Sequence, residues 1–542
     1  MNFITLINDN FIRMFNVESL DVEYRNNLNF IDEKKVLERI WDKDGSLWKI
    51  NDDVASNSLG WLNLPEQSKF LSENSISFIS ALCDKYESIC LVGMGGSILG
   101  AKAIIDCLGQ DASKNFIIGD STLPSSIDLF QKIVESRKTL FVIASKSGTT
   151  LETMMIYEHL KKITGSGLHE NLFVAITDSD TNLGEIAFHD KFQKTFFGLT
   201  DVGGRYSVLS YFGLLPAALM GCDTSLISQA SINMKKELES SEMGNCNLAS
   251  TIASLLGACS LNGVDKLTFI MPQKLNSFGS WLEQLVAESI GKDNIGLVPI
   301  TNEPFLETDS YLKDRIFIYF RSGDKENVVQ DLHVKKLIDA KFPVLWIEIE
   351  EFHFVGGQFF LWQMVIAILG ALLKINPFDQ PDVEKTKVSV NRILNKTKVN
   401  LKFDYCEDLN IIKSTLSSIN SKSYVALLAF ITEDNKQIEH LEKLRKKIGD
   451  KYKLATTLGI GPGYLHSNGQ MYKGGLKPAH SIFLVNNGTT FNANQDYSKF
   501  AQITEAQVFS EIEIFKNLGV QSTCLDISER SKFRIIDLVE AI

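Results

Sequence analysis

The sequence predicts an α/β protein made of doubly wound parallel sheets. Short apolar runs of β-type residues alternate with segments long enough for a helix, and this alternation starts again further along the chain. Such spacing is typical of parallel sheets whose ligand loops lie at the carboxyl ends of the strands. The first series of expected strands comprises Leu91–Val92, Phe116–Ile118, Leu140–Ala144 and Leu172–Ile176.

Two further series follow. A helical connection over about 207–262 leads to the second series, which ends in an apolar helix over 356–374. The third and smaller series has expected strands at Tyr424–Phe430 and Ser481–Val485, and a charged helix over about 436–448. The expected strands of the second series are Leu267–Met271, Ile295–Pro299, Ile316–Phe320 and Val344–Ile349.

A chain of 542 residues is too long for one hydrophobic core and should divide into about three or four domains. A polar stretch rich in Lys and Asn reads as the linker between the second and third series. The expected division is a helical N-terminal segment at 1–75, domains at 76–262 and 263–388, a linker at 389–422 and a C-terminal α/β unit at 423–542.

Composition limits the classes of partner. The formal net charge of −11 argues against nucleic acid, and eight scattered cysteines without a C-x-x-C pair predict a reduced, cytoplasmic protein without a metal site. No secretory signal is expected from the first residues. The longest apolar stretch, Phe359–Leu373, is shorter than the roughly 20 residues that a bilayer requires, which favours a buried helix over a membrane span.

Two tracts predict a phosphate site. Leu91–Gly100 (LVGMGGSILG) and Leu140–Thr150 (LFVIASKSGTT) are apolar strands that lead into loops rich in glycine and hydroxyls, followed by helical patterns. Backbone N–H groups at a helix N-terminus favour an anion. The first tract alone also resembles a degenerate dinucleotide loop, with Asp120 near the position of a ribose-binding acid. The second tract argues against a nucleotide, because its cluster of hydroxyls suits the three oxygens of a phosphate monoester.

Three further segments carry candidate catalytic groups, each with a structural alternative. Arg205, in GGRYS, could stabilise an oxyanion or pair with a surface carboxylate. Glu288 falls on the apolar side of a helix over Phe278–Ile290, where desolvation would raise its pKa toward that of a general base; the alternative is a solvated carboxylate paired with Lys292. The loop NPFDQP can hold Gln380 and Lys387 over a site, or simply connect two helices.

Together these segments resemble the glucose-6-phosphate isomerase family, whose members contain two sugar-isomerase (SIS) domains. The motifs GMGGS, SKSGTT, GGRYS, ESIGKD and NPFDQPDVEKTK occur in the family's order over residues 91–387. Three more segments, IWDKDGSLWKI, LGWLNLP and ATTLGIGPGYLHSNGQMYKGG, resemble the isomerase half of bacterial transaldolase/glucose-6-phosphate isomerase fusions. The chain is about 250 residues too short to carry the transaldolase barrel as well.

The resemblance implies a role for each matching residue. It implies that Glu288 moves a proton between C2 and C1 through a cis-enediol, that Arg205 stabilises this intermediate, and that Lys387 assists ring opening beside Gln380. It implies that the sugar phosphate is held by Gly96, Ser97, Ser145, Lys146, Ser147 and Thr150. It also implies that the enzyme needs no cofactor and works as a homodimer.

The sequence departs from the family at one place, because the family's usual histidine is absent from 301–313. His333 and His353 lie in what read as a helix and a strand end, where a structural role is expected. We hypothesise instead that His466, in the glycine-rich segment Gly461–Gln470, opens the ring as a neutral imidazole, with Lys473 as a further contact. The alternative is that this segment is a tight turn of the C-terminal unit.

The sequence thus predicts a glucose-6-phosphate isomerase that acts on a small sugar phosphate in glycolysis and gluconeogenesis. Two alternatives stay open within the same fold: an isomerase that also accepts mannose 6-phosphate, and a non-catalytic regulator that only binds sugar phosphates. A dinucleotide-dependent dehydrogenase is a more distant alternative.

Overall fold

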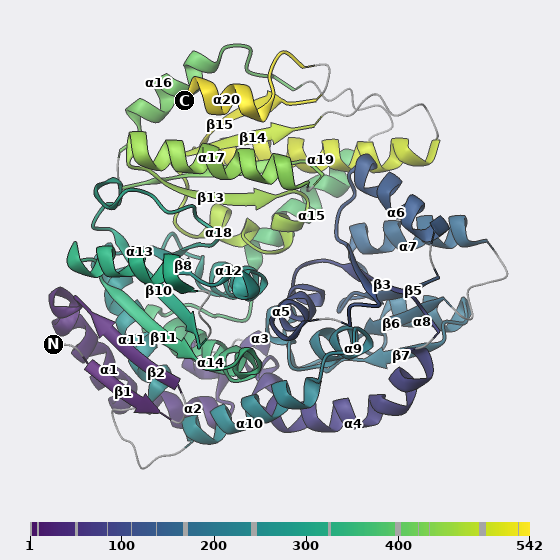
Figure 1. Cartoon of the computed structure of the whole chain (residues 1–542), viewed down its shortest axis with the longest axis horizontal. Coiled ribbons are helices and arrows are strands. Elements are labelled where there is room, and N and C mark those ends of the chain that lie inside the picture. Colours follow the sequence, from purple (N-terminus) through teal and green to yellow (C-terminus); the bar gives the residue numbers. More distant parts are fainter. Residues whose placement is uncertain are drawn as a thin grey trace.

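The computed structural model of the chain contains three β-sheets covered by helices, which form the three lobes of Figure 1. This confirms the predicted α/β class with parallel, doubly wound sheets. The structure describes residues 3–7, 10–48, 53–83, 85–109, 111–136, 138–165, 172–239, 247–323, 327–395, 403–420, 422–432, 434–486, 495–528 and 531–542.

The first sheet is parallel throughout, with the strand order β4-β3-β5-β6-β7. This order reverses direction between β3 and β5, and ligands of open α/β sheets bind at such a switch point. Three of its strands are fully buried, which explains why their sequences are apolar on both faces. The strands are β3 (Ser88–Gly93), β4 (Asn115–Gly119), β5 (Thr139–Ala144), β6 (Phe173–Thr177) and β7 (Lys194–Phe197).

The second sheet is mixed, with the order β1-β2-β11-β10-β8-β9. The four strands of the second series, β8, β9, β10 and β11, pair in parallel, while β2 runs antiparallel to β11. The strands are β1 (Phe3–Ile7), β2 (Asn10–Phe15), β8 (Lys266–Ile270), β9 (Val298–Ile300), β10 (Arg315–Ser322) and β11 (Val344–Ile349).

The first two strands correct the expectation that residues 1–75 are helical. The hairpin of β1 and β2 extends the second sheet, and Ile12 and Met14 on β2 are buried in the main core. Strands of this kind form because they pair with an open sheet edge far away in the sequence. The rest of the segment is helical, as expected.

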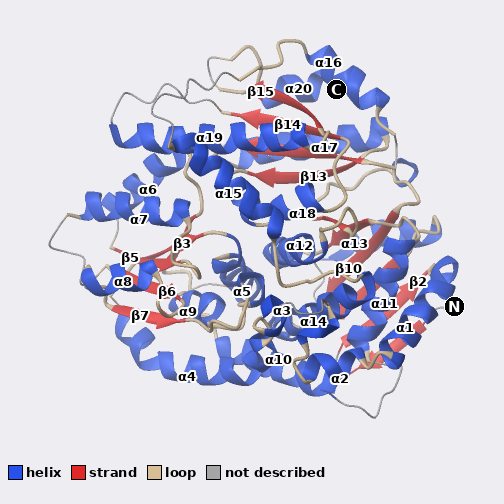
Figure 2. Cartoon of the chain, turned by 180° about the vertical axis from the view of Figure 1, so that it is seen from behind, coloured by secondary structure: helices blue, strands red, loops and turns tan. Residues whose placement is uncertain are grey.

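The third sheet, in the C-terminal unit, is parallel with the order β13-β12-β14-β15, and helices lie on both sides of its strands in Figure 2. Alternate residues of β12 point to opposite faces, so Leu427 packs with α16, α17 and α20, and Leu428 packs with α18 and α19. The strands are β12 (Tyr424–Phe430), β13 (Ala455–Ile460), β14 (His480–Val485) and β15 (Gln521–Asp526).

The stretch 389–422 is not a simple linker. It begins inside α15 (Pro381–Leu394) and contains α16 (Leu409–Ser418), whose Ile412 and Leu416 are buried in the core of the C-terminal unit. Its Lys and Asn side chains made the stretch look like an exposed connection, although two apolar residues one helical turn apart are enough to dock a short helix.

Two helices join the first two sheets. The apolar helix predicted at 356–374 is present as α14 (Val355–Leu373), which is buried along almost its whole length and packs on α10, α11 and α12. Among the described residues, Phe352–Leu373 is the one segment long and apolar enough to cross a bilayer, and 94% of its most apolar window is buried inside the protein. The second joining helix, α12 (Asn276–Ile290), packs against α5 and carries Glu288 near its end.

The remaining helices occupy the connections between strands. The helical connection predicted at 207–262 is confirmed as α9, α10 and α11. The other helices are α1 (Asp21–Glu33), α2 (Val36–Trp41), α3 (Asp53–Ser56), α4 (Leu64–Cys83), α5 (Leu99–Leu108), α6 (Pro124–Ser136), α7 (Leu151–Thr164), α8 (Asn182–His189), α9 (Tyr211–Leu219), α10 (Thr224–Glu239), α11 (Leu248–Leu261), α13 (Val328–Asp339), α17 (Asn435–Tyr452), α18 (Gly469–Gly474), α19 (Gln495–Asn517) and α20 (Ile535–Ala541).

Candidate active site

The turn after β3 meets two other loops, and this contact explains its glycines. Gly95 has a φ of +50°, and a Cβ atom there would lie 2.5 Å from the carbonyl oxygen of His466. At Gly96 a Cβ atom would lie 2.3 Å from the carbonyl oxygen of Gly204. No side chain fits in either place, so only glycine lets the three loops approach. Ser97, which ends this turn, is buried.

The loop between β5 and α7 gathers hydroxyl groups at the start of a helix. Ser145 Oγ lies 3.0 Å from Thr150 Oγ1, and Thr149 Oγ1 donates to Ser147 Oγ at 3.1 Å. Because α7 begins at Leu151, its first backbone N–H groups have no partner within the helix. Hydroxyls and free N–H groups at the positive end of a helix dipole can bind an anion such as a phosphate.

Lys146 differs from its neighbours in this loop. Its ammonium group pairs with the carboxylate of Asp178 and donates to the carbonyl oxygen of Leu199 at 2.7 Å. Among the described residues that line the adjacent cavity, its neighbours Ser147 and Thr149 are present and Lys146 is not. The charge of Lys146 therefore ties the loop to the end of β6 instead of facing the cavity.

A cavity of about 220 Å³ lies where this loop, α15 and the C-terminal unit meet. Lys387 reaches it from α15, with a half-exposed side chain whose Nζ pairs with Glu384 Oε1 at 2.6 Å. The structure thus brings the hydroxyl-rich loop, Lys387 and His466 together at one cavity. The lining consists of Ser147, Thr149, Thr150, Leu151, Glu152, Val383, Thr386, Lys387, Val390, Asn391, Leu465, His466 and Gln507.

Glu288 lies on the buried side of α12, as predicted from the apolar face of that helix. Only 7% of the residue is exposed, and Nη1 of Arg205 lies 3.6 Å from Glu288 Oε2. Burial raises the pKa of Glu288, while the charge of Arg205 and a hydrogen bond from Gln284 partly oppose this rise. A carboxyl group of this kind can accept and return a proton near neutral pH.

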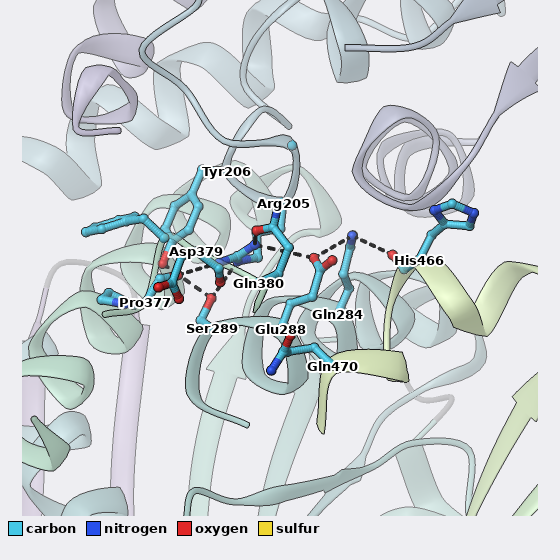
Figure 3. A network of polar contacts seen from close by, with 12 residues as sticks. Arg205, Tyr206, Gln284, Glu288, Ser289, Pro377, Asp379, Gln380, His466 and Gln470 are labelled. Atoms are coloured by element: carbon cyan, nitrogen blue, oxygen red, sulfur yellow. Dashed lines mark hydrogen bonds and ion pairs between the residues drawn. The ribbon is translucent and has the colours of Figure 1, made fainter. Parts of the chain in front are cut away.

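Arg205 organises the loop that follows α14. Its Nη1 donates to Gln380 Oε1 at 2.8 Å, and its Nη2 donates to the carbonyl oxygens of Pro377 at 2.6 Å and Asp379 at 2.9 Å. Its Nε donates to Ser289 Oγ at 2.8 Å, directly beside the catalytic candidate. Figure 3 shows the guanidinium group between this loop and the Glu288 carboxylate.

Gln284 connects Glu288 to the C-terminal unit. Its Nε2 donates to Glu288 Oε2 and to the carbonyl oxygen of His466, both at 3.0 Å. In Figure 3 the ring of His466 points away from this contact. The backbone of His466 therefore belongs to the Glu288 network, while its side chain belongs to the cavity.

The imidazole of His466 is held by an acid. His466 Nε2 lies 3.0 Å from Glu152 Oε1, and Gln507 Nε2 donates to the same oxygen at 2.6 Å. Burial alone would lower the pKa of His466, but the nearby charge of Glu152 outweighs it and the pKa lies above the ordinary value. Burial would raise the pKa of Glu152, but the charge and hydrogen bond of His466 lower it. Glu152 therefore favours the imidazolium form of His466, whereas the sequence analysis expected a neutral imidazole.

Lys473, which was expected to contact the ligand, and the two histidines expected to be structural all have partners within the protein. Lys473 is not free to contact a ligand, because its Nζ forms a buried ion pair with Glu511 Oε1 at 2.7 Å. His333 stacks on Phe305 with ring centroids 4.1 Å apart, and burial lowers its pKa to about 4. His353 pairs with Glu351 at 3.2 Å.

Sequence reasoning missed Glu152, Gln284 and Gln507. One signal could have identified Glu152. It is an acidic residue in the first turn of the helix that follows the hydroxyl-rich loop, and such a residue would repel a bound phosphate unless a cation were nearby. Gln284 stands one helical turn before Glu288, where a hydrogen bond to it could be expected. Nothing in the sequence near Gln507 indicates its partner.

Comparisons with known proteins agree with this geometry. The family model "Phosphoglucose isomerase" matches residues 69–297. The glucose-6-phosphate isomerase of Campylobacter jejuni is 27% identical over 400 residues, which cover 64% of this chain and 95% of that protein. The enzyme of the same name from Fusobacterium nucleatum is 26% identical over 449 residues, covering 70% of this chain and 96% of that protein.

The fold is shared with a solved structure as well. A glucose-6-phosphate isomerase from Chlamydia trachomatis superimposes with a TM-score of 0.62 at 16% identity, over 76% of this chain and 92% of that chain. The matched part contains the hydroxyl-rich loop, Arg205 and Glu288, all within 69–297. Over residues 69–297 the chain is similar to the phosphoglucose isomerase family.

Proposed function

We propose that this protein is a glucose-6-phosphate isomerase, an aldose–ketose isomerase that interconverts glucose 6-phosphate and fructose 6-phosphate. One observation supports this above all: a buried carboxylate with a raised pKa, Glu288, lies beside Arg205 and is one glutamine side chain away from the loop that carries His466. Proton transfer between adjacent carbons needs a base, a group that stabilises the intermediate and an acid that opens the ring.

The chemistry divides between the cavity and the Glu288 network. The phosphate binds to the hydroxyls of Ser147 and Thr150 and the N-terminus of α7, supported by Ser145 and by the backbone of the turn at Gly96 and Ser97. The imidazolium of His466 donates a proton to the ring oxygen as the C1–O5 bond of glucose 6-phosphate breaks, and the C1 hydroxyl releases its proton to solvent to leave an aldehyde. Lys387, on the same cavity wall, favours the developing negative charge.

Isomerisation then takes place at Glu288. Its carboxylate removes the proton from C2, the electron pair moves to form the C1–C2 double bond, and the C1 oxygen takes up a proton from solvent to give the enediol. The same carboxyl group returns its proton to C1, and the C2 hydroxyl releases a proton to solvent to give the ketone. Arg205 stabilises the negative charge that develops on the C1 oxygen before it is protonated, and Gln380 is held beside it by a hydrogen bond from Arg205.

The alternatives lack a specific observation in their favour. A regulator that only binds sugar phosphates would need the loop at 145–150, but not a buried carboxylate whose pKa is raised. We infer that the substrate is a sugar phosphate and that the reaction needs no cofactor, because both proton transfers use side chains of this chain.

We further propose that the protein works in the cytoplasm, in glycolysis and gluconeogenesis, and forms a homodimer. The six cysteines whose surroundings the structure describes are all free thiols, as a reducing compartment favours. Most oligomers are symmetric dimers, and sedimentation velocity would measure the oligomeric state directly.

The proposed activity is tested with the purified full chain and fructose 6-phosphate. Formation of glucose 6-phosphate is followed by coupling to a dehydrogenase that reduces NADP. Mannose 6-phosphate is offered in a parallel assay to measure selectivity between the two epimers. Binding of fructose 6-phosphate without any turnover would overturn the enzymatic proposal and favour the regulator.

A further inference from the structure

Lys292 is a buried cation next to the proposed active site that the mechanism above does not use. It follows Glu288 by four residues, immediately after α12 ends, and 5% of the residue is exposed. A buried ammonium group is costly unless its hydrogen bonds and its charge are satisfied. Its partners therefore indicate what its charge does.

Both partners of Lys292 lie in the loop 376–380. Its Nζ lies 2.8 Å from Asp379 Oδ1 and donates to the carbonyl oxygen of Asn376. Arg205 binds the same loop through the carbonyl oxygens of Pro377 and Asp379. Two cations thus hold one short loop, and Nη1 of Arg205 lies 3.6 Å from Glu288 Oε2 while Lys292 follows Glu288 by four residues.

The loop held in this way supports groups that the proposed reaction needs. Gln380 stands at its end and accepts the hydrogen bond from Arg205 Nη1, the same nitrogen that lies 3.6 Å from Glu288. If the loop moved, the partners of Arg205 would move with it. Such a shift would change the position of the guanidinium group relative to the carboxylate.

We propose that Lys292 is a positioning residue: its charge locks the loop 376–380 against the end of α12 and so holds Arg205, Gln380 and Glu288 in their working arrangement. This proposal rests on the proposed function, because it assigns Lys292 a part in that reaction. Lys292 does not touch the substrate in this scheme and acts only through its neighbours.

The electrostatics of the cluster agree with this role. Burial and the charge of Arg205 lower the pKa of Lys292 to about 8, while Asp379 and Glu288 oppose this shift. In turn, the positive charge of Lys292 helps to keep the pKa of Glu288 from rising further. The charged groups that act on Lys292 are thus Arg205 on the loop before α9, Glu288 on α12 and Asp379 on the loop that Lys292 holds.

The test replaces Lys292 with methionine and with arginine in the full chain. K292M removes the charge, so the pKa of Glu288 should rise, as expected when a nearby opposite charge is lost. The acid side of the kcat/KM profile for fructose 6-phosphate should move to higher pH by the same amount, and kcat/KM at its optimum should fall about 10- to 100-fold. K292R keeps the charge and should restore most of the pH profile. K335M, at an exposed lysine on α13, is the control for charge loss alone.

A readout that does not depend on turnover separates this proposal from the proposed function. The carboxyl carbon of Glu288 can be titrated by ¹³C NMR, its signal being the one that disappears in E288Q. A normal Glu288 titration in K292M, with an unchanged pH profile, would overturn the role of Lys292 even if the wild type is a good isomerase. If the wild type shows no turnover but the Glu288 signal shifts in K292M, the positioning role stands and the proposed function fails.

D379N provides a second variant in case K292M does not fold. It removes the counter-charge and leaves the lysine, so Lys292 should lose its proton at lower pH. The decline of kcat/KM at alkaline pH should then begin at a lower pH than in the wild type. An unchanged alkaline side of the profile would contradict the proposal.

Discussion

Glu288 is subject to two opposing effects. Burial in the end of α12 raises its pKa, and the nearby Arg205 lowers it again. A fully desolvated carboxylate would stay protonated at neutral pH, whereas a strongly paired one would be too weak a base. In the proposed mechanism the raised pKa makes Glu288 a stronger base than an exposed glutamate, and Arg205 keeps its charged form accessible.

E288Q tests this residue directly. Glutamine keeps the shape of the side chain and its contact with Gln284 but cannot accept a proton, so turnover of fructose 6-phosphate should fall by about 10²–10⁴ while the substrate still binds. Turnover is measured with the coupled assay and binding by calorimetry. E439Q, at an exposed glutamate on α17, should leave both unchanged. Near-normal turnover in E288Q would exclude Glu288 as the base.

The hydroxyls of the loop at 145–150 allow a second test with single substitutions. A hydrogen bond to a charged group contributes about 1.5–3 kcal/mol, so S147A and T150A should each raise KM for fructose 6-phosphate by roughly 10-fold or more. Inhibition by inorganic phosphate should weaken in parallel, because phosphate shares only this part of the substrate. S414A, at an exposed serine on α16, is the control. If KM and phosphate inhibition both stayed constant, the loop would have a structural role only.

What the sequence could reveal at this scale depended on short-range patterns. Glu288 was predictable because the apolar face of its helix lies within a few residues of it. Glu152 and Gln507 were not, since they are 355 residues apart and meet only when the C-terminal unit docks on the first sheet. For the same reason Lys473 looked available for a ligand until its partner on α19 was known.

At the scale of elements, the turn that carries His466 links two parts of the site. Its backbone accepts a hydrogen bond from Gln284 on α12, and its side chain pairs with Glu152 on α7. A loop fixed at two points loses less conformational entropy when substrate binds. In the proposed mechanism the turn therefore supplies the acid that opens the ring, and its two attachments fix the distance between the cavity and Glu288.

H466A should affect ring opening and spare isomerisation. With fructose 6-phosphate, which is mainly cyclic, turnover should fall far more than with erythrose 4-phosphate, whose phosphate on O4 prevents ring closure. Exchange of the C2 proton of erythrose 4-phosphate into D₂O, followed by NMR, isolates the step at Glu288. Equal losses with both substrates would remove His466 from ring opening.

E152Q gives the matching pH test. The Glu152 carboxylate raises the pKa of His466, so its neutralisation should lower that pKa. The imidazolium would then be lost at lower pH. The alkaline side of the kcat profile for fructose 6-phosphate should therefore move to lower pH. The profile for erythrose 4-phosphate should not move.

Strands buried on both faces were the elements that the sequence predicted best, because continuous apolar runs such as β5 and β12 need no partner to be recognised. The hairpin of β1 and β2 was missed because its polar residues interrupt the pattern, and only pairing with β11 explains it. Likewise β7 has mostly exposed or half-exposed residues and is a strand because it completes the edge of the first sheet.

At the scale of the whole molecule, the C-terminal unit is attached by buried polar contacts that also reach the site. Arg445 on α17 donates to the carbonyl oxygens of Thr301 and Asn302, which follow β9 of the second sheet. Gln470 donates to the carbonyl oxygen of Gly291 at 3.1 Å, directly after the helix that carries Glu288. The unit therefore contributes His466 and at the same time supports the end of α12.

The contact between Lys473 and Glu511 makes the strongest prediction at this scale. Both side chains are almost completely buried, Lys473 Nζ also donates to Thr386 Oγ1 at 2.7 Å, and Tyr464 donates to Glu511 Oε2 at 3.3 Å. These contacts join α18 and α19 of the C-terminal unit to α15, beside Lys387. Each partner is thus needed to keep the other's charge satisfied.

K473M should leave the charge of Glu511 buried without a partner and destabilise the full chain by about 3–5 kcal/mol, measured as a shift of the denaturant midpoint. In K473M/E511Q both charges are gone, and the glutamine can still accept a hydrogen bond from one of the two hydroxyls of Thr386 and Tyr464 and donate to the other, so much of the loss should be recovered. K443M, which removes an exposed lysine on α17, should change the midpoint little. The turn before α18 carries His466, so a displaced α18 should also displace that histidine. At a low temperature where K473M remains folded, it should therefore turn over cyclic fructose 6-phosphate more slowly than the double variant. If the single and double variants were equally stable and equally active, the ion pair would not hold the C-terminal unit against the site.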